Sequence, residues 1–219
     1  MNAKTPLRKN LAESTYLQLR ERIVNLKVQP LEALDEKQLS ADLDVGLAPI
    51  RDAFKRLEQD HLVVIYPRRG TFVAPVGLGD VQAVMELRLA NESLAAKLTA
   101  ERASPNERQM LHDMASELAT VRDKRRMIAT DADVHTTVAA LTRNSYLQAV
   151  IERHLNLALR LWFLCNSNFE IPSDVGVDHT PTTEAILAGD GETAAARLRE
   201  HIVHDSEQIR DLLSTQGHR

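Results

Sequence analysis

The sequence predicts a mainly α-helical protein with one small β-hairpin, organised as two domains over residues 1–75 and 80–215. Three observations support this fold class. Hydrophobic residues make up 43% of the 219 residues, and the chain has only eight glycines and eight prolines. Apolar residues recur at helical spacing through most of the chain. The β-rich runs gather between residues 62 and 73, and a short linker follows them.

Three helices are predicted before the hairpin. The first covers residues 11–26, and its apolar residues form one inner stripe. The second is short, over residues 35–43, with Asp35 as its N-cap. The third starts near Ala48 and carries a buried stripe of its own. Two short helices joined by a tight turn form a helix-turn-helix unit.

A β-hairpin is predicted next, because residues 62–66 and 71–73 are β-rich and flank a four-residue turn that ends in Gly70. A hairpin directly after this unit predicts a winged helix-turn-helix. Its third helix would enter the major groove of DNA, and its wing would reach phosphates or the minor groove. Any one basic residue here reads as a solvated surface charge, but the ordered set favours DNA binding. The cations in question are Arg51, Lys55, Arg68 and Arg69.

Three segments carry a family pattern: residues 39–43 (LSADL), residues 48–58 (APIRDAFKRLE), and residues 62–63 followed by 69–73 (RGTFV). They resemble the DNA-binding domain of GntR-type bacterial transcription factors. In that family certain positions contact DNA, and the resemblance implies the same contacts here. Those positions fall on Lys37, Leu47, Arg51 and Gly70.

One position departs from that family. GntR-type proteins usually have a Ser-Arg pair just before the recognition helix, where the arginine can make a base contact worth about 1–3 kcal/mol. This chain has Gly46-Leu47 instead. We therefore do not expect the family's usual operator sequence to carry over, whereas the fold and the phosphate contacts remain.

Six helices are predicted after the linker, and they form an all-α antiparallel bundle. Ser104 and Asp190 are expected N-caps, and Gly189 is an expected C-terminal cap. The predicted helices cover residues 80–101, 105–122, 126–141, 146–166, 181–188 and 192–214.

Polar residues interrupt two apolar helix faces of this bundle. The two stripes are Ile128, Asp131, His135 and Val138, and Ala194, Leu198, His201 and Asp205. Their members are three or four residues apart, so each stripe lies on one face of a helix. An unpaired buried polar group costs roughly 1–3 kcal/mol. A shared metal ion is one reason for such groups to meet in a core.

The bundle carries a second family pattern. Its motifs are Glu86-Leu87-Arg88 with Glu92, Asp131 to His135, Arg143 to Leu147, Asp178-His179, Glu184-Ala185-Ile186 with Gly189-Asp190, and His201. They resemble the FCD effector domain that accompanies many GntR-type domains, in the shorter six-helix form of the FadR-like subfamily. That family's common metal-binding set is one aspartate and three histidines. Residue by residue, the set falls on Asp131, His135, His179 and His201.

Three imidazoles and a carboxylate suit a divalent ion, with Zn²⁺ expected first and Ni²⁺, Mn²⁺ or Fe²⁺ as alternatives. All ligands must be deprotonated, so occupancy is expected to fall at low pH. Arg88 lies on an inward stripe with Glu92. It either binds a small carboxylate effector bidentately or forms a buried pair with Glu92 at i, i+4, and the sequence leaves both open. The remaining histidines are interpreted as surface or packing residues: His112, His154, His204 and His218.

Composition limits the remaining possibilities. Residues 1–75 hold 12 Lys and Arg against 10 Asp and Glu, and the rest of the chain holds 15 against 21, so a polyanion is expected to meet the N-terminal part. The single Cys165, in an apolar stretch, is expected to be a core thiol in a reducing compartment. No apolar run approaches the roughly 20 residues that span a bilayer. We therefore expect a cytoplasmic protein with no membrane contact.

These observations predict a DNA-binding transcriptional regulator rather than an enzyme. It would act as a homodimer on a palindromic double-stranded operator, with a metal and a small carboxylate effector in its bundle. Leu87, Leu94 and Leu98 give the first bundle helix a second apolar face, which is either a partner surface or core. One alternative is a metal-dependent hydrolase, although no nucleophile motif or general base is evident. Another is a protein–protein adaptor that has lost sequence-specific DNA binding, which Gly46-Leu47 keeps open.

Overall fold

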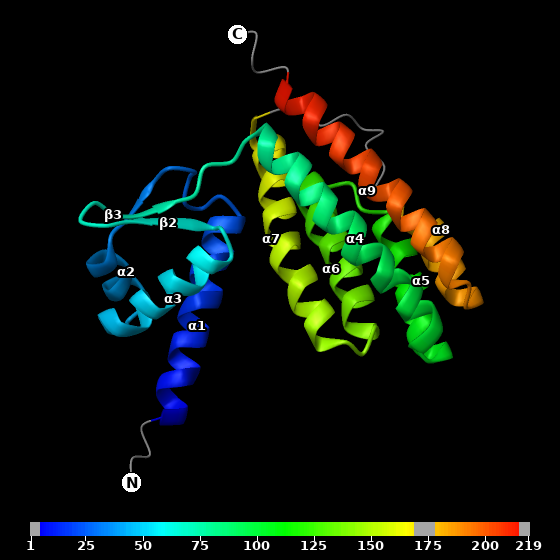
Figure 1. Ribbon diagram of the computed structural model, residues 1–219, viewed down its shortest axis with the longest axis horizontal. Coiled ribbons are helices and arrows are strands. Elements are labelled where there is room, and N and C mark those ends of the chain that lie inside the picture. Colours follow the sequence, from blue (N-terminus) through cyan, green and yellow to red (C-terminus); the bar gives the residue numbers. More distant parts are fainter. Residues whose placement is uncertain (1–4, 169–177, 215–219) are drawn as a thin grey trace. The chain divides into compact units, whose positions relative to one another are not determined.

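The structure, a computed structural model, describes residues 5–168 and 178–214. The chain divides into two compact units, Met1–Val76 and Gly77–Arg219 (Figure 1). The described part is mainly helical with one small antiparallel sheet, which confirms the predicted fold class. Within it, no helix combines the length and hydropathy that crossing a bilayer requires.

Within its described residues, the first unit contains three helices and three strands. In chain order they are α1 (Thr5–Val24), β1 (Ala33–Leu34), α2 (Glu36–Asp42), α3 (Leu47–Gln59), β2 (Val63–Tyr66) and β3 (Gly70–Val73). Asp35 caps α2 as predicted, because its carboxylate accepts the backbone N–H groups of Lys37 and Gln38 at 2.7 and 2.9 Å. Helices α1 and α3 pack together around buried Leu19, Phe54 and other apolar residues.

The wing is a β2–β3 hairpin in which Tyr66 pairs with Gly70, so the turn contains three residues rather than the four predicted. Gly70 has φ of 105°, a conformation that residues with a Cβ rarely adopt. Strand β1 pairs with β3 and completes a sheet of order β1-β3-β2. The sequence analysis missed β1, since two residues are too few to show alternation.

The described residues of the second unit form a six-helix bundle, as predicted. Its helices are α4 (Leu78–Arg102), α5 (Pro105–Leu118), α6 (Lys124–Leu141), α7 (Ser145–Asn168), α8 (Thr180–Ala188) and α9 (Gly191–Ser214). Ser104 caps α5 through a capping box with Glu107, and Gly189 ends α8 with φ of 76°. Helix α5 ends at Leu118, earlier than predicted, because Asp123 already caps α6.

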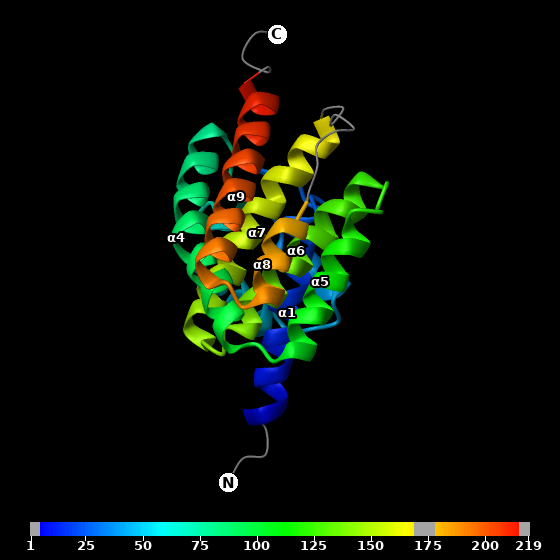
Figure 2. The ribbon, with the colours of Figure 1, turned by 90° about the vertical axis from the view of Figure 1, so that its right-hand side faces the viewer.

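The core of this unit lies between α4 and the helices that pack on it. Small residues of α4, such as Ala95, Ala96 and Ala100, are buried against larger apolar side chains. Helices α4 and α9 lie along each other, which Figure 2 shows from the side of the bundle. The close approach of α4, α6, α8 and α9 brings their inward polar residues together.

Candidate metal centre and DNA-binding surface

Four buried residues meet inside the bundle: Asp131, His135, His179 and His201. Asp131 and His135 lie one turn apart on α6, so both point to the same side of that helix. His179 is the N-cap residue of α8, and His201 lies on the buried face of α9. One ligand atom from each residue lies within 4.8 Å of all the others. Three helical segments thus bring together the set that the sequence analysis named.

The carboxylate of Asp131 is the centre of this cluster. Its Oδ1 lies 2.7 Å from His179 Nε2 and 3.6 Å from His201 Nε2. Its Oδ2 lies 3.8 Å from His135 Nε2. The three histidines therefore present the same ring nitrogen to one carboxylate, and the His179 and His201 ring centroids are 4.1 Å apart.

The donor set fits a divalent cation. Nitrogen and oxygen ligands at about 2.0–2.2 Å from an ion lie roughly 3–4 Å from one another. A small inward movement of the four side chains would therefore let all of them bind one ion. His201 Nε2 is buried and has no hydrogen-bond partner among the described residues. Burial and the nearby His201 lower the pKa of His179 to about 4, so its imidazole is neutral at pH 7, as a ligand must be.

Residues of α4 surround the centre. Arg88 Nε donates to Glu92 Oε1 at 2.8 Å, and both side chains are buried. Glu92 Oε2 lies 2.5 Å from His135 Nδ1, outside the linear geometry of a hydrogen bond. A carboxylate on the Nδ1 side leaves the Nε2 lone pair of His135 directed at the centre. Arg88 Nη2 lies 3.0 Å from that same Nε2, a contact that coordination of a metal by His135 would replace.

Arg88 faces inward, as the sequence predicts. It forms the buried ion pair with Glu92, which was one of the two roles that the sequence analysis left open for it. The sequence analysis interpreted His154 as a surface or packing residue and missed its polar contact. The His154 side chain is 2% exposed, and its Nε2 lies 3.4 Å from Glu92 Oε1. Its helical spacing from Ile151 and Leu155 was the available signal. His204 is exposed, and His218 lies outside the described residues. His112 Nδ1 is 3.2 Å from Thr183 Oγ1.

Asp205 also reaches the centre, and the sequence analysis gave it no role. It is 2% exposed, and its Oδ2 lies 3.2 Å from His201 Nε2 and 3.6 Å from Arg88 Nη1. Its position one turn after His201 on the same apolar stripe was the signal for a side chain that points inward.

The cations predicted to contact DNA remain on the surface of the first unit. Lys55 is exposed on α3, and Arg51 Nε donates to Glu36 Oε2 at 2.9 Å in an exposed pair. Arg56 differs from both, because its guanidinium lies 3.8 Å from the centroid of the Tyr16 ring and pairs with Glu13. Arg56 therefore joins α3 to α1, and its guanidinium is less available for contact with DNA than the side chains of Arg51 and Lys55.

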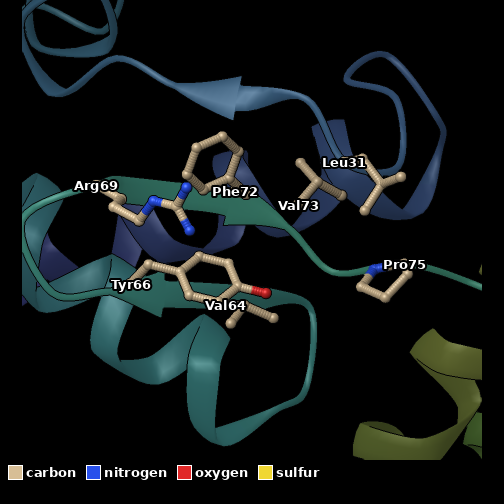
Figure 3. Close-up of a pocket in the computed structure, with 7 residues that line it drawn as sticks. All are labelled: Leu31, Val64, Tyr66, Arg69, Phe72, Val73 and Pro75. Carbon is tan, nitrogen blue, oxygen red and sulfur yellow. The ribbon is translucent and has the colours of Figure 1, made fainter.

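Arg68 and Arg69 are exposed at the wing, where Arg68 has φ of 63°. Arg69 lines a pocket of about 540 Å³ on the outer face of the sheet, and its side chain lies beside Tyr66 and Phe72 (Figure 3). Those two rings pack edge to face with centroids 5.8 Å apart. Lys37, at the first turn of α2, is also exposed on the surface of this unit.

Comparison with known proteins matches both units. The FCD domain family matches residues 83–204, and the family described as bacterial regulatory proteins, gntR family, matches residues 11–73. The chain is 24% identical over 203 residues to the uncharacterized HTH-type transcriptional regulator YdhC of Bacillus subtilis, covering 90% of each chain. It is 21% identical to the HTH-type transcriptional repressor RspR of Escherichia coli, covering 91% of this chain and 89% of that protein. The solved structure of E. coli McbR/YncC has the same fold, with a TM-score of 0.76, 19% identity and coverage of 94% and 98%.

Proposed function

Because the chain belongs to the GntR family of bacterial transcriptional regulators with an FCD domain, we propose that its DNA binding is controlled by a divalent metal and a small organic acid. It is a DNA-binding regulator, as its relatives are. The observation that carries the finer proposal is the buried cluster of one aspartate and three histidines. In this proposal Asp131, His135, His179 and His201 hold the ion, with Zn²⁺ expected first. The ion would supply a Lewis-acidic anchor for the effector.

The two alternatives lose support. The two matching families and the relatives' names are those of regulators, which favours a regulator over a metal-dependent hydrolase. An adaptor without DNA binding would not need exposed cations on α3 and the wing. The arrangement of Arg51, Lys55, Arg68 and Arg69 around one helix and one hairpin supports an operator contact, with Lys37 and Gly70 as further contact positions.

We propose that the regulator acts as a homodimer on a palindromic operator. Leu87 and Leu94 are 48% and 46% exposed on α4, at a spacing of seven residues that places them on one face. Leu98, the third residue of the predicted apolar face, instead packs partly against the core. A two-fold dimer would present two winged helices to two half-sites, so the operator would share that symmetry.

An operator selection tests the whole proposal. Random double-stranded DNA is selected with the full chain in four conditions: metal-free, with Zn²⁺, with a mixture of small carboxylates, and with both. We expect an inverted repeat to be enriched, and its occupancy to change when zinc and an acid are present together. Enrichment that ignores both additives would contradict control by metal and acid. No enrichment would contradict sequence-specific binding.

We expect the wing arginines to act on DNA mainly through charge. Replacing Arg68 and Arg69 together with Ala should weaken binding to every sequence and reduce the slope of log K against log salt by about 2, because each lost phosphate contact removes about 0.9. Affinity measured over a salt series checks this. The matched control is the double change of Arg122 and Arg126 to Ala, which removes the same charge from exposed positions of the bundle. Equal slopes for the wing variant and wild type would exclude a wing contact.

Zinc affinity is expected to fall as the pH is lowered. Burial lowers the pKa of His201, but the neighbouring Asp205 outweighs it and the pKa lies above its ordinary value. Near pH 6 the metal-free protein therefore holds a proton on His201 that zinc must displace, whereas His179 is already neutral. We expect log affinity to fall by about one per pH unit below the pKa of His201, and more steeply below about pH 4. Zinc titrations from pH 5 to 8 check this, and a flat profile would contradict it.

A further inference from the structure

Arg88 lies between two carboxylates that it holds unequally. Its Nε donates a hydrogen bond to Glu92 Oε1 at 2.8 Å, and Glu92 lies one turn after Arg88 on the same helix. Its Nη1 lies 3.6 Å from Asp205 Oδ2 on α9, an ion-pair distance that is longer than a hydrogen bond. All three side chains are nearly fully buried. Glu92 is therefore the fixed partner of the guanidinium, and Asp205 is the loosely held one.

Ion-pair contacts to Arg88 and His201 hold the Asp205 carboxylate where it lies. Its Oδ2 has no hydrogen-bond partner among the described residues, although the side chain is 2% exposed. It lies 3.2 Å from His201 Nε2, an atom that the proposed metal would take. Ion-pair contacts hold this oxygen less firmly than the 2.8 Å hydrogen bond from Arg88 holds Glu92, so Asp205 is the carboxylate that a better acceptor can displace from Arg88.

We propose that Asp205 is an internal competitor of the effector, so that a small carboxylate binds the bundle by taking the place of the Asp205 carboxylate on Arg88. This rests on the proposed function, since it assumes an organic-acid effector. A free carboxylate can accept from Nη1 and Nη2 together, which gives two charge-assisted hydrogen bonds in place of one loose ion pair. Nη2 is now 3.0 Å from His135 Nε2, and metal binding by His135 would release it.

The exchange would have two consequences. Asp205 lowers the affinity of the site for acids through repulsion between like charges, so it sets the acid concentration at which the regulator responds. It also links helices, because Arg88 lies on α4 and Asp205 on α9, which pack along each other. An acid on Arg88 would replace this contact between two helices with a contact to the ligand.

Calorimetric titration of the zinc-loaded full chain with acetate, lactate, malate and citrate tests the inference. We expect Asp205→Asn to bind at least one of these acids about tenfold more tightly than wild type, because the competing charge is gone. The matched control is Glu207→Gln, which removes an exposed carboxylate from the same helix and should change the affinity by less than about twofold. Adding Arg88→Gln to Asp205→Asn should abolish acid binding. Melting temperatures identify any misfolded variant, and Asp205→Ser then takes the place of Asp205→Asn.

The outcomes separate this inference from the proposed function. If wild type binds an acid and Asp205→Asn binds it no more tightly, the competitor role is wrong while the effector class stands. If Asp205→Asn loses zinc affinity by more than about tenfold, Asp205 is a metal ligand and the competitor role is also wrong. If neither protein binds any of the four acids, the proposed effector class fails and the inference fails with it.

Discussion

Removing the metal from the bundle is expected to lower its melting temperature by roughly 10 °C. An ion present at a thousand times its Kd stabilises the native state by about 4 kcal/mol. For a chain of this size each kcal/mol corresponds to about 2–4 °C. The physical reason is the buried cluster, where His201 Nε2 and Asp205 Oδ2 have no hydrogen-bond partners among the described residues. Scanning calorimetry before chelation, after chelation and after adding Zn²⁺ measures the shift.

The metal-free bundle is nevertheless expected to fold. Arg88 supplies a buried positive charge beside Glu92, Asp205 and Asp131, and these carboxylates outweigh burial and raise the pKa of Arg88 above its ordinary value. The guanidinium therefore offsets part of the negative charge that the metal would neutralise. This is why we expect a lowered transition rather than a missing one.

Ligand substitutions identify the site. His135→Ala and His201→Ala should each lose the metal, and the response to an organic acid should be lost with it, while DNA binding can persist. The matched control is His204→Ala, an exposed histidine on the same helix as His201, which should keep one ion per chain. Elemental analysis of protein purified without a chelator or an affinity tag gives the metal content. No bound metal and no thermal shift with Zn²⁺, Ni²⁺ or Mn²⁺ would falsify the metal site, and the cluster would then be a hydrogen-bonded pocket.

Arg51→Ala is expected to weaken operator binding by about 1–3 kcal/mol, or roughly 5- to 150-fold, and to relax base preference at one position in each half-site. Arg51 is exposed on α3, the helix predicted to enter the major groove, and its side chain pairs with Glu36. An exposed ion pair contributes about 0–1 kcal/mol to stability, so the loss should come from DNA contact rather than unfolding. Binding to the selected operator, to its single-base variants and to random DNA measures the effect.

Arg51→Lys is the matched control for this change. Lysine keeps the charge but lacks the fork of donors that recognises a guanine edge, so affinity for random DNA should be kept while base preference is lost. Equal losses on operator and random DNA for Arg51→Ala would assign Arg51 to phosphate alone. Unchanged operator binding would exclude the docking of α3 in the groove.

Much of the fold could be predicted because its signals are local. Asp35, Ser104 and Gly189 mark helix ends through bonds and backbone angles within a few residues, and the structure confirms all three. Helical periodicity placed the six bundle helices within a few residues of their observed ends, and family resemblance named the four candidate ligands. Strand β1 was missed because its two residues acquire their conformation only from pairing with β3.

The sequence by itself determined the order of the elements and which residues face inward, since caps, turns and helical periodicity act between residues near in the chain. Only the tertiary structure decided which inward polar groups meet. Arg88 and Asp205 are more than a hundred residues apart, Glu92 and His135 are more than forty apart, and nothing local relates the members of either pair. Packing of α4 against α6 and α9 places them within a few ångströms of one another, where burial strengthens every charge–charge contact. The family resemblance could therefore name the four candidate ligands from the sequence, whereas the roles proposed for Glu92 and Asp205 depend on neighbours that only folding supplies.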